Sequence, residues 1–471
     1  MSSALQKRIG IALFLGAAIA ASAFAGCAYF EYDAAPGRPF ILYNITLADS
    51  YLGIVHVSGR VLGSAARTAS LGTFLGADGK RMEPIDFGAK GLDGTQLSFR
   101  EKDETWTIES KGRDFSFEYD VALTVDDRHS VDVRDIMTFI DADRCRLLGR
   151  DVFLVPEFPI EEGIVVDFVM RPGWRVSSSA TCIRSRIVVN DPADLPFTMT
   201  VSGEYRSLER RVGGSEIVLA IAGSWSFSDE EFFDVVCRIV SEEIALFGSS
   251  PRSRYLIICD ANNAAGEDRF DYYGVHYGAS MMLLLDRNLD RSELMDTPMA
   301  IIAHEFFHNW NGEALAPAGD EFLWFTEGVT NYYSYYVLLR AGVISAAQLE
   351  DRSRAIFERY RSNPYAANVS IGEAANSDMS DKNMVSLLYD GGYLAARNLD
   401  ERLREDSGGR VTLVDVLKRM YENAHGSGTA DESSLLSAVK ELAGSDLSGY
   451  LQTLVHTPDP KPLVSRASAL E

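Results

Sequence analysis

Two histidines four residues apart, His304 and His308, constrain this chain more than any other feature, and Glu305 directly follows the first of them. Residues four apart share one face of an α-helix, so both imidazoles of this HExxH pattern can point at one metal ion. The chain holds only 7 histidines, which makes a chance match uncommon. The pattern therefore predicts a metal-binding helix; the alternative is two helix-face histidines with ordinary partners.

A third ligand candidate, Glu327, follows His308 after 18 intervening residues. Catalytic zinc typically takes three protein ligands and keeps one position for water, whose pKa it lowers from about 16 to about 7. A second helix that starts near Thr326 and folds back would bring Glu327 to the metal. We therefore predict one Zn²⁺ ion held by His304, His308 and Glu327, with Glu305 as the general base.

The N-terminus has the pattern of an export signal. A short basic region precedes an apolar run from Ile9 to Ala25, which is typical of a secretory leader and short for a membrane span. Small residues before Cys27 resemble a bacterial lipobox, in which the cysteine is lipidated. Ordinary cleavage after Ala23 or Ala25 and an uncleaved anchor are the alternatives. We expect an exported protein facing the periplasm or cell exterior, with a lipid anchor to the membrane through Cys27.

The charge composition limits which classes of partner the chain can bind. The chain has 68 acidic against 45 basic residues, a formal net charge of -23, whereas binding to phosphates needs a positive field. We therefore expect no nucleic-acid partner and interpret the acidic surface as a source of solubility.

The cysteines beyond Cys27 argue against a thiolate metal site, because none stands in a CxxC pair. An oxidising compartment would permit a disulfide such as Cys145–Cys182, and buried free thiols are the alternative.

Behind the leader at 1–27, the pattern divides the chain into three predicted domains. Short apolar or alternating runs, broken by Gly, Asp, Asn and Pro, predict a β-rich N-terminal domain over 28–222. A zinc-binding catalytic domain is predicted over 223–343 and a helical C-terminal domain over 344–471. The predicted fold class is therefore α+β.

Within the second and third predicted domains, residues typical of helix and strand ends predict where the helices and strands begin and end. Ser228 opens a helical pattern that Gly248 stops. A buried strand is predicted over 255–259, a possible strand over 277–286, the zinc helix from Thr297, and a second helix ending at Gly342. Further helices are predicted to start near residues 345, 381, 412 and 429, ahead of a loose tail from residue 458.

The HExxH and glutamate spacing resembles the gluzincin peptidases and, among them, the glycyl aminopeptidase family of bacterial metallopeptidases. The resemblance lies in the segments HEFFHNWN at 304–311, LWFTEGVTNYY at 323–333 and YDGG at 389–392, and it is specific from about residue 228 to 404. It implies a β-rich N-terminal domain, a thermolysin-like zinc catalytic domain and a helical C-terminal domain.

The resemblance also implies a catalytic role for Tyr389. Gluzincin aminopeptidases use the phenol of a Tyr-x-Lys-Gly segment to donate a hydrogen bond to the oxyanion of the tetrahedral intermediate. Tyr389 matches that frame with Gly391 in place of Lys, and Tyr393 is the nearby rival. One helical turn beyond Glu327, Asn331 is a candidate acceptor for the second N–H of a ligating histidine, and an ordinary hydrogen bond is its alternative role.

Three departures from the family pattern bear on specificity. The family has Gly-Gly-Leu-Glu-His ahead of the zinc helix, with its Glu thought to bind the free amine of the substrate; here 273–277 reads YGVHY, with His276 in place of that Glu. An imidazole cannot hold an ammonium group as a carboxylate does. The family's basic residues after Trp-Asn are absent here, since Asn311 is followed by Gly-Glu-Ala. We also expect this chain to lack the PDZ domain of many members.

These features predict a zinc metallopeptidase that acts on peptide or protein substrates, with aminopeptidase and endopeptidase modes both open. The alternative is a catalytically weak, zinc-containing surface lipoprotein that binds peptides or a partner, which the altered residue His276 would suit. The intact Glu305 argues against this alternative, because a binding site needs no base. The oligomeric state is left open.

Overall fold

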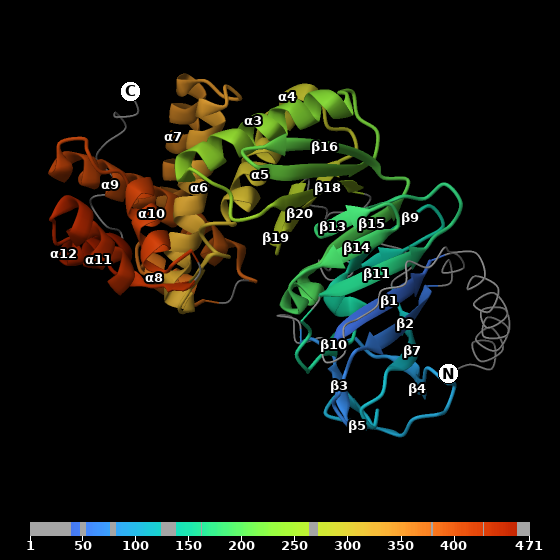
Figure 1. Ribbon diagram of the computed structural model, residues 1–471. Helices are drawn as coiled ribbons and strands as arrows, with labels where there is room; N and C mark the ends of the chain where they lie inside the picture. Colours follow the sequence, from blue (N-terminus) through green and yellow to red (C-terminus); the bar gives the residue numbers. More distant parts are fainter. Residues whose placement is uncertain are drawn as a thin grey trace. The chain divides into compact units, whose positions relative to one another are not determined.

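The computed structural model describes residues 39–47, 53–75, 82–123, 138–161, 163–262, 272–377, 380–426 and 428–458. The chain forms two compact units, Met1–Glu204 and Tyr205–Glu471 (Figure 1). The predicted leader with Cys27, and the tail beyond residue 458, lie outside the described residues. Among the helices that are described, none has the length and apolar character needed to span a bilayer.

The first unit is β-rich, as predicted. Its largest sheet has seven strands in the order β13-β14-β11-β1-β2-β7-β4. In β2 every second residue is buried, the pattern of a strand with one face on a core. The strands are β1 Phe40–Thr46, β2 Ile54–Leu62, β4 Ile85–Gly91, β7 Phe115–Ala122, β11 Ile164–Val169, β13 Thr181–Ile183 and β14 Arg186–Val189.

Two four-stranded sheets complete this unit, in the orders β10-β3-β6-β5 and β12-β15-β9-β8. Their strands are β3 Ala69–Gly72, β5 Phe99–Lys102, β6 Thr105–Ile108, β8 Phe139–Ile140, β9 Arg144–Leu148, β10 Val155–Pro156, β12 Val176–Ser178 and β15 Met199–Gly203. The short 3-10 helix η2, Gly149–Asp151, lies between β9 and β10, and η3, Pro192–Phe197, lies between β14 and β15.

The four cysteines in the described residues are free thiols, so the disulfide Cys145–Cys182 that the sequence permits is not formed. Cys145, Cys237 and Cys259 are buried. Burial raises the pKa of the Cys145 thiol to about 12, which makes it a poor nucleophile.

The second unit begins earlier than the predicted boundary at residue 222. Its five-stranded sheet has the order β16-β17-β18-β20-β19, with β16 Arg206–Val212, β17 Ser215–Ala222, β18 Arg254–Asn262, β19 Tyr272–Tyr277 and β20 Ser280–Asp286. β17 pairs in parallel with β18 through the connecting helix α3, Asp229–Phe247. The strands β16 and β17 therefore belong to the same unit as the predicted metal-binding helix, although no sequence signal separates them from the strands of the first unit.

The predicted strand over 277–286 is the second arm of a hairpin. β19 and β20 pair antiparallel from Tyr272 to Leu285, and residues 278–279 form the turn. Gly278 has a φ of 57° there, which glycine adopts without strain. β19 lies at the end of the strand order, so it is an edge strand among the described residues.

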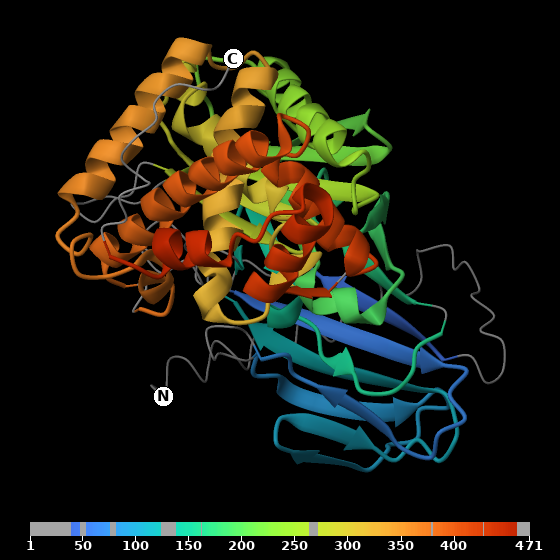
Figure 2. The ribbon, with the colours of Figure 1, turned by 90° about the vertical axis from the view of Figure 1, so that its left-hand side faces the viewer.

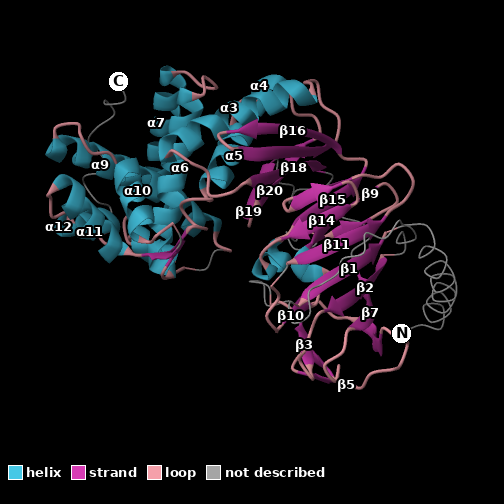
Figure 3. Cartoon of the chain, in the orientation of Figure 1, coloured by secondary structure: helices cyan, strands magenta, loops and turns pink. Residues whose placement is uncertain are grey.

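Helices fill the rest of the unit (Figures 2 and 3). They are α4 Arg291–Leu294, α5 Thr297–Phe307, α6 Leu323–Arg340, α7 Ala346–Ser362, α8 Ile371–Ala375, α9 Lys382–Ser407, α10 Leu413–Asn423, α11 Glu432–Ala443 and α12 Ser448–Val455, with the 3-10 turn η4 Asp320–Phe322. The predicted caps Ser228, Ser345, Asp381 and Thr412 open α3, α7, α9 and α10.

The prediction of a helix start at residue 429 is wrong. Thr429 lies in the short strand β22, Gly428–Ala430, which pairs in parallel with β21, Leu315–Pro317. The helix α11 is capped instead by Asp431, whose side chain accepts from the backbone N–H of Ser434.

One buried carboxyl group in the core of this unit should make the free energy of unfolding depend on pH. Glu243 on α3 is 0% exposed, neither of its oxygens has a hydrogen-bond partner in the described structure, and burial raises its pKa well above 4.5. The unfolded chain releases this proton near pH 4.5 whereas the folded chain keeps it, so the free energy of unfolding falls as pH rises, by up to about 1.4 kcal/mol per unit.

The free energy of unfolding, measured by urea unfolding, has a slope against pH to which Glu243 contributes. We therefore expect Glu243→Gln to remove this contribution between about pH 5 and about pH 7. Glu242→Gln, on the adjacent and partly exposed residue, serves as the control and should keep the wild-type slope. Equal slopes for wild type and Glu243→Gln would contradict the assignment of a neutral carboxyl.

Candidate metal centre and active site

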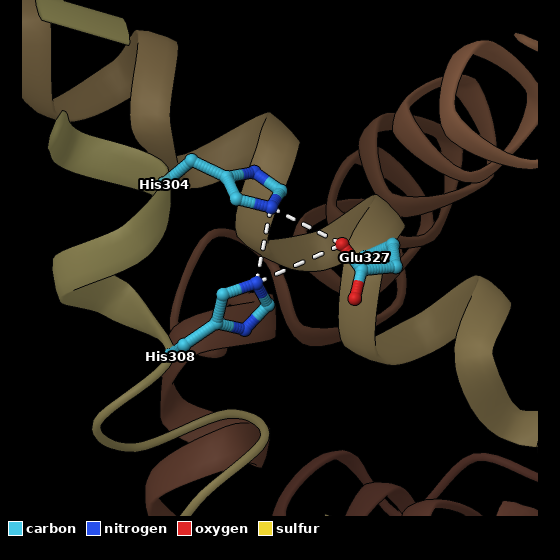
Figure 4. Close-up of side chains that lie close together, drawn as sticks. All are labelled: His304, His308 and Glu327. Carbon is cyan, nitrogen blue, oxygen red and sulfur yellow. Dashed lines mark hydrogen bonds and ion pairs between the residues drawn. The ribbon is translucent and has the colours of Figure 1, made fainter. Parts of the chain in front are cut away.

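The side chains of His304, His308 and Glu327 converge at one point in the second unit (Figure 4). α5 carries His304 and ends at His308, which is its C-terminal cap, and α6 carries Glu327. His304 Nε2 lies 3.1 Å from Glu327 Oε2 and 3.0 Å from His308 Nε2, while His308 Nε2 lies 3.7 Å from the same carboxylate oxygen. Residues that are 23 positions apart therefore present one atom each to a common centre.

These three donors fit a zinc ion. Ligands about 2.0 to 2.2 Å from a tetrahedral zinc lie about 3.3 Å from one another, and the observed separations of 3.0, 3.1 and 3.7 Å bracket that value. The other ring nitrogen of His308, Nδ1, is 2.8 Å from the carbonyl oxygen of Asn311. A carbonyl only accepts, so Nδ1 carries a proton, and Nε2 is the nitrogen that would bind a metal at the centre.

The electrostatics of the cluster also suit a cation. Burial would lower the pKa of His308, but the Glu327 carboxylate outweighs burial and raises it to about 9. Burial would in turn raise the pKa of Glu327, and the two imidazoles hold it well below 4.5. The carboxylate therefore stabilises positive charge between the three side chains, and a metal ion would replace the proton on His308.

A loop between α5 and α6 fixes the orientation of His308. The loop residue Asn311 is 1% exposed, its carbonyl accepts from His308, and its side-chain amide donates to the carbonyl of Thr326, directly before Glu327. One residue therefore positions both helices at the centre. The acceptor for His308 in the structure is thus the carbonyl of Asn311 and not the candidate Asn331. In the sequence, the only sign of this role was that Asn311 follows Trp310 directly.

The next loop residue, Gly312, lies against the His308 ring. Its φ is 139°, a conformation that L side chains rarely adopt. A Cβ at this position would also sit 3.0 Å from His308 Nδ1. A larger residue would therefore displace either the ring or the loop.

Tyr389 reaches the centre from α9. Its ring stacks on that of His304 with 6.0 Å between centroids. Burial, and then the carboxylate of Glu327, raise the pKa of its phenol well above 10, so the O–H remains a donor at neutral pH. The rival Tyr393 is buried elsewhere and bonds to the hydroxyl of Ser353 at 2.6 Å.

Two glycines allow α9 to come this close. A Cβ on Gly328 of α6 would collide with the backbone of Gly392, and a Cβ on Gly392 would lie 2.8 Å from the Cα of Gly328. The two helices therefore meet backbone to backbone, one residue after Glu327 and three after Tyr389. Gly391, which stands where the family has Lys, packs against Ile371 and Tyr360.

The edge strand β19 passes over the proposed base. A Cβ on Gly274 would lie 3.2 Å from Glu305 Oε1 and would collide with Ile301, so only glycine permits this approach. Tyr273 on the same strand has a pKa raised to about 12, first by burial and then by Glu305. His276 lies with its Nδ1 2.8 Å from the carbonyl oxygen of Glu305 and 2.8 Å from the hydroxyl of Tyr255.

Comparison with known proteins identifies this region. A sequence profile described as M61 glycyl aminopeptidase matches residues 297–394, the segment that spans α5, α6 and Tyr389. The chain is a zinc metallopeptidase. The predicted resemblance to glycyl aminopeptidases is confirmed over this segment. A search of curated proteins gave no match.

Solved structures support the α+β fold of the metallopeptidase. An aminopeptidase N family protein from Idiomarina loihiensis superposes with a TM-score of 0.72 at 18% identity, covering 89% of this chain and 76% of that one. An M1 zinc metallopeptidase from Deinococcus radiodurans gives a TM-score of 0.57 at 13% identity, covering 91% of this chain and 96% of the other. At these identities the likeness concerns the fold.

The loop glycine of the metallopeptidase gives a test of the metal centre. We expect Gly312→Ala to weaken zinc binding about tenfold or more, because its Cβ would press on the His308 ring that needs a fixed orientation. Competition with a chelator measures the affinity. Gly342→Ala is the matched control, since Gly342 also has a positive φ but a Cβ there meets open space; unchanged zinc affinity in Gly312→Ala would contradict this account.

Proposed function

We propose that this metallopeptidase hydrolyses peptide bonds, with zinc held by His304, His308 and Glu327, Glu305 as the general base and Tyr389 as the oxyanion donor. One observation supports this proposal above the others: Tyr389 stacks on the ring of His304, and the carboxylates of Glu327 and Glu305 both lie close enough to its phenol to raise the phenol pKa further, beyond the effect of burial. A centre built only for structure would need neither Tyr389 nor Glu305.

Zinc, when bound, polarises a carbonyl and lowers the pKa of water to about 7. Glu305 would take the proton of the attacking water and pass it to the leaving amine, the two roles of a general base and acid. The Tyr389 O–H would donate a hydrogen bond to the oxygen that becomes negative as the carbonyl carbon turns tetrahedral. Its raised pKa supports this role, because a phenolate could not donate.

The family description favours an aminopeptidase, and a solved structure of a mutant Deinococcus radiodurans M1 enzyme is described as bound to a Tyr-Ser-Ala substrate. The amine-binding glutamate of the family is His276 here, and its Nδ1 is engaged with the backbone of Glu305. We therefore propose peptides as the substrates, with the position of the cleaved bond decided by experiment.

The first test is Glu305→Gln. We expect the variant to keep zinc, because Glu305 is not among the converging donors, and to lose hydrolysis of a mixed peptide library by about 100- to 10,000-fold, the usual contribution of a general base. Products trimmed from the N-terminus would establish an aminopeptidase, and internal cuts an endopeptidase. A wild-type chain that binds zinc and cleaves no peptide would favour the alternative, a zinc-containing protein that binds peptides or a partner.

The second test is Tyr389→Phe, which removes only the hydroxyl. We expect kcat to fall about 100-fold with little change in KM, because the lost hydrogen bond forms only as the oxyanion develops. Tyr393→Phe is the control: it removes a buried hydrogen bond to Ser353 and should lower stability by about 1 kcal/mol while leaving kcat near wild type. An equal loss of kcat in both variants would argue against a specific role for Tyr389.

We further propose that the protein is exported and anchored through Cys27. This proposal rests on the leader sequence alone. Mass spectrometry of the mature chain from a membrane fraction would test it, since a free N-terminus upstream or downstream of residue 27 would contradict lipidation.

A further inference from the structure

A chain of charged side chains lies beside the metal centre and takes no part in the mechanism above. Arg252, in the segment before β18, donates a hydrogen bond of 2.7 Å to Glu313 Oε2. The other oxygen, Oε1, lies 3.4 Å from His276 Nε2, longer than an ordinary hydrogen bond but within ion-pair distance. Glu313 therefore stands between Arg252, in the segment before β18, and His276 on β19.

Glu313 belongs to the loop that orients His308. Its backbone N–H donates to the carbonyl of His308 at 2.9 Å. It directly follows Gly312, whose Cα faces the His308 ring, and lies two residues after Asn311, whose carbonyl fixes the tautomer. Any displacement of Glu313 would therefore move the groups that hold this histidine in place.

The partners of Glu313 are themselves fixed. His276 has a side chain only 9% exposed and contacts the Glu305 carbonyl through its other nitrogen. The ring of His276 is thus held from both sides, because Nδ1 faces the Glu305 carbonyl and the Tyr255 hydroxyl while Nε2 faces the Glu313 carboxylate. On the other side, Trp310 of the same loop stacks on Phe247 and donates to the carbonyl of Ser249, three residues before Arg252.

The charge of Glu313 is maintained by these neighbours. The contact with His276 is the largest influence that lowers its pKa, and the charge of Arg252 and a backbone hydrogen bond from Gly278 add to it, against partial burial. Gly278 lies in the turn between β19 and β20. One ionised carboxylate therefore links the segment before β18, the β19–β20 hairpin and the His308 loop.

We propose that Glu313 is a positioning residue for the metal centre: by pairing with Arg252 and His276, its carboxylate fixes the loop whose Asn311 carbonyl orients His308. The proposal rests on the metal centre of the proposed function but not on the peptidase reaction. A purely structural ion pair would stabilise the fold without affecting the metal, and this difference makes the two roles separable.

A matched pair of variants tests the proposal. Glu313→Gln removes the charge and keeps the shape of the side chain, and Glu242→Gln does the same at a pair with Arg340 that joins α3 to α6 through an equally short bond of 2.7 Å. We expect Glu313→Gln to weaken zinc binding about tenfold in a chelator competition, the lower end for groups behind a ligand, and Glu242→Gln to stay within about twofold of wild type.

Two further readouts distinguish positioning from general stability. The melting temperature of the metal-free protein should fall no further in Glu313→Gln than in Glu242→Gln, and the visible spectrum of the cobalt-substituted protein should shift only in Glu313→Gln. Zinc affinity and cobalt spectrum indistinguishable from wild type in Glu313→Gln would overturn the proposal, as would a wild-type chain that binds no zinc. Because no readout is catalytic, absence of peptidase activity would leave this result standing.

A second series covers the case in which Glu313→Gln folds poorly. Arg252→Lys keeps a positive charge opposite Glu313, whereas Arg252→Gln removes it. We expect the lysine variant to retain zinc affinity within about threefold and the glutamine variant to lose more. Equal zinc affinity in the two variants would overturn the proposed role of the ion pair.

Discussion

Everything at this centre depends on keeping three donor atoms within 3.7 Å of one another, although they come from two helices and the residue that caps the first. Two imidazoles and a carboxylate that close are stable only with a positive charge between them. The pKa of His308 is raised and that of Glu327 is lowered for this reason. The surrounding contacts keep the three donor atoms together by fixing the backbone that carries them. Asn311 is the main example, because its carbonyl holds one ligand and its amide donates to the residue before another.

The metal ligands could be predicted from sequence because their geometry is largely local. Four residues along one helix place His304 and His308 on a common face, and a single loop brings in Glu327. The helix starts at Ser228, Ser345 and Asp381 could be predicted equally well, because a cap residue bonds to a backbone N–H within three positions of itself. The identity of Tyr389, by contrast, came from resemblance to a family, because its approach to the centre depends on a helix crossing.

Other features escaped prediction because they are made by distant contacts. Strands β16 and β17 follow the first unit with no break that their sequences signal, and only pairing with β18 places them in the second unit. The strand β19 was not predicted, because the strand expected over 277–286 corresponds to β20 and the turn before it. The role of His276 was visible only as a departure from a family; the ring proves to be buried among Tyr255, the backbone of Glu305 and the carboxylate of Glu313.

The backbone contact between Gly328 and Gly392 has a consequence for how such a site can change over time. Where two helices meet without side chains between them, their separation is set by main-chain atoms alone, and the stretch of chain joining them exerts little control over it. The loops around α7 and α8 could then change in length while Tyr389 keeps its place beside His304, provided that Tyr360 and Ile371 still pack against α9. The number of residues between Glu327 and Tyr389 is thus a weak constraint, whereas the loss of either glycine would move these two side chains apart from a distance.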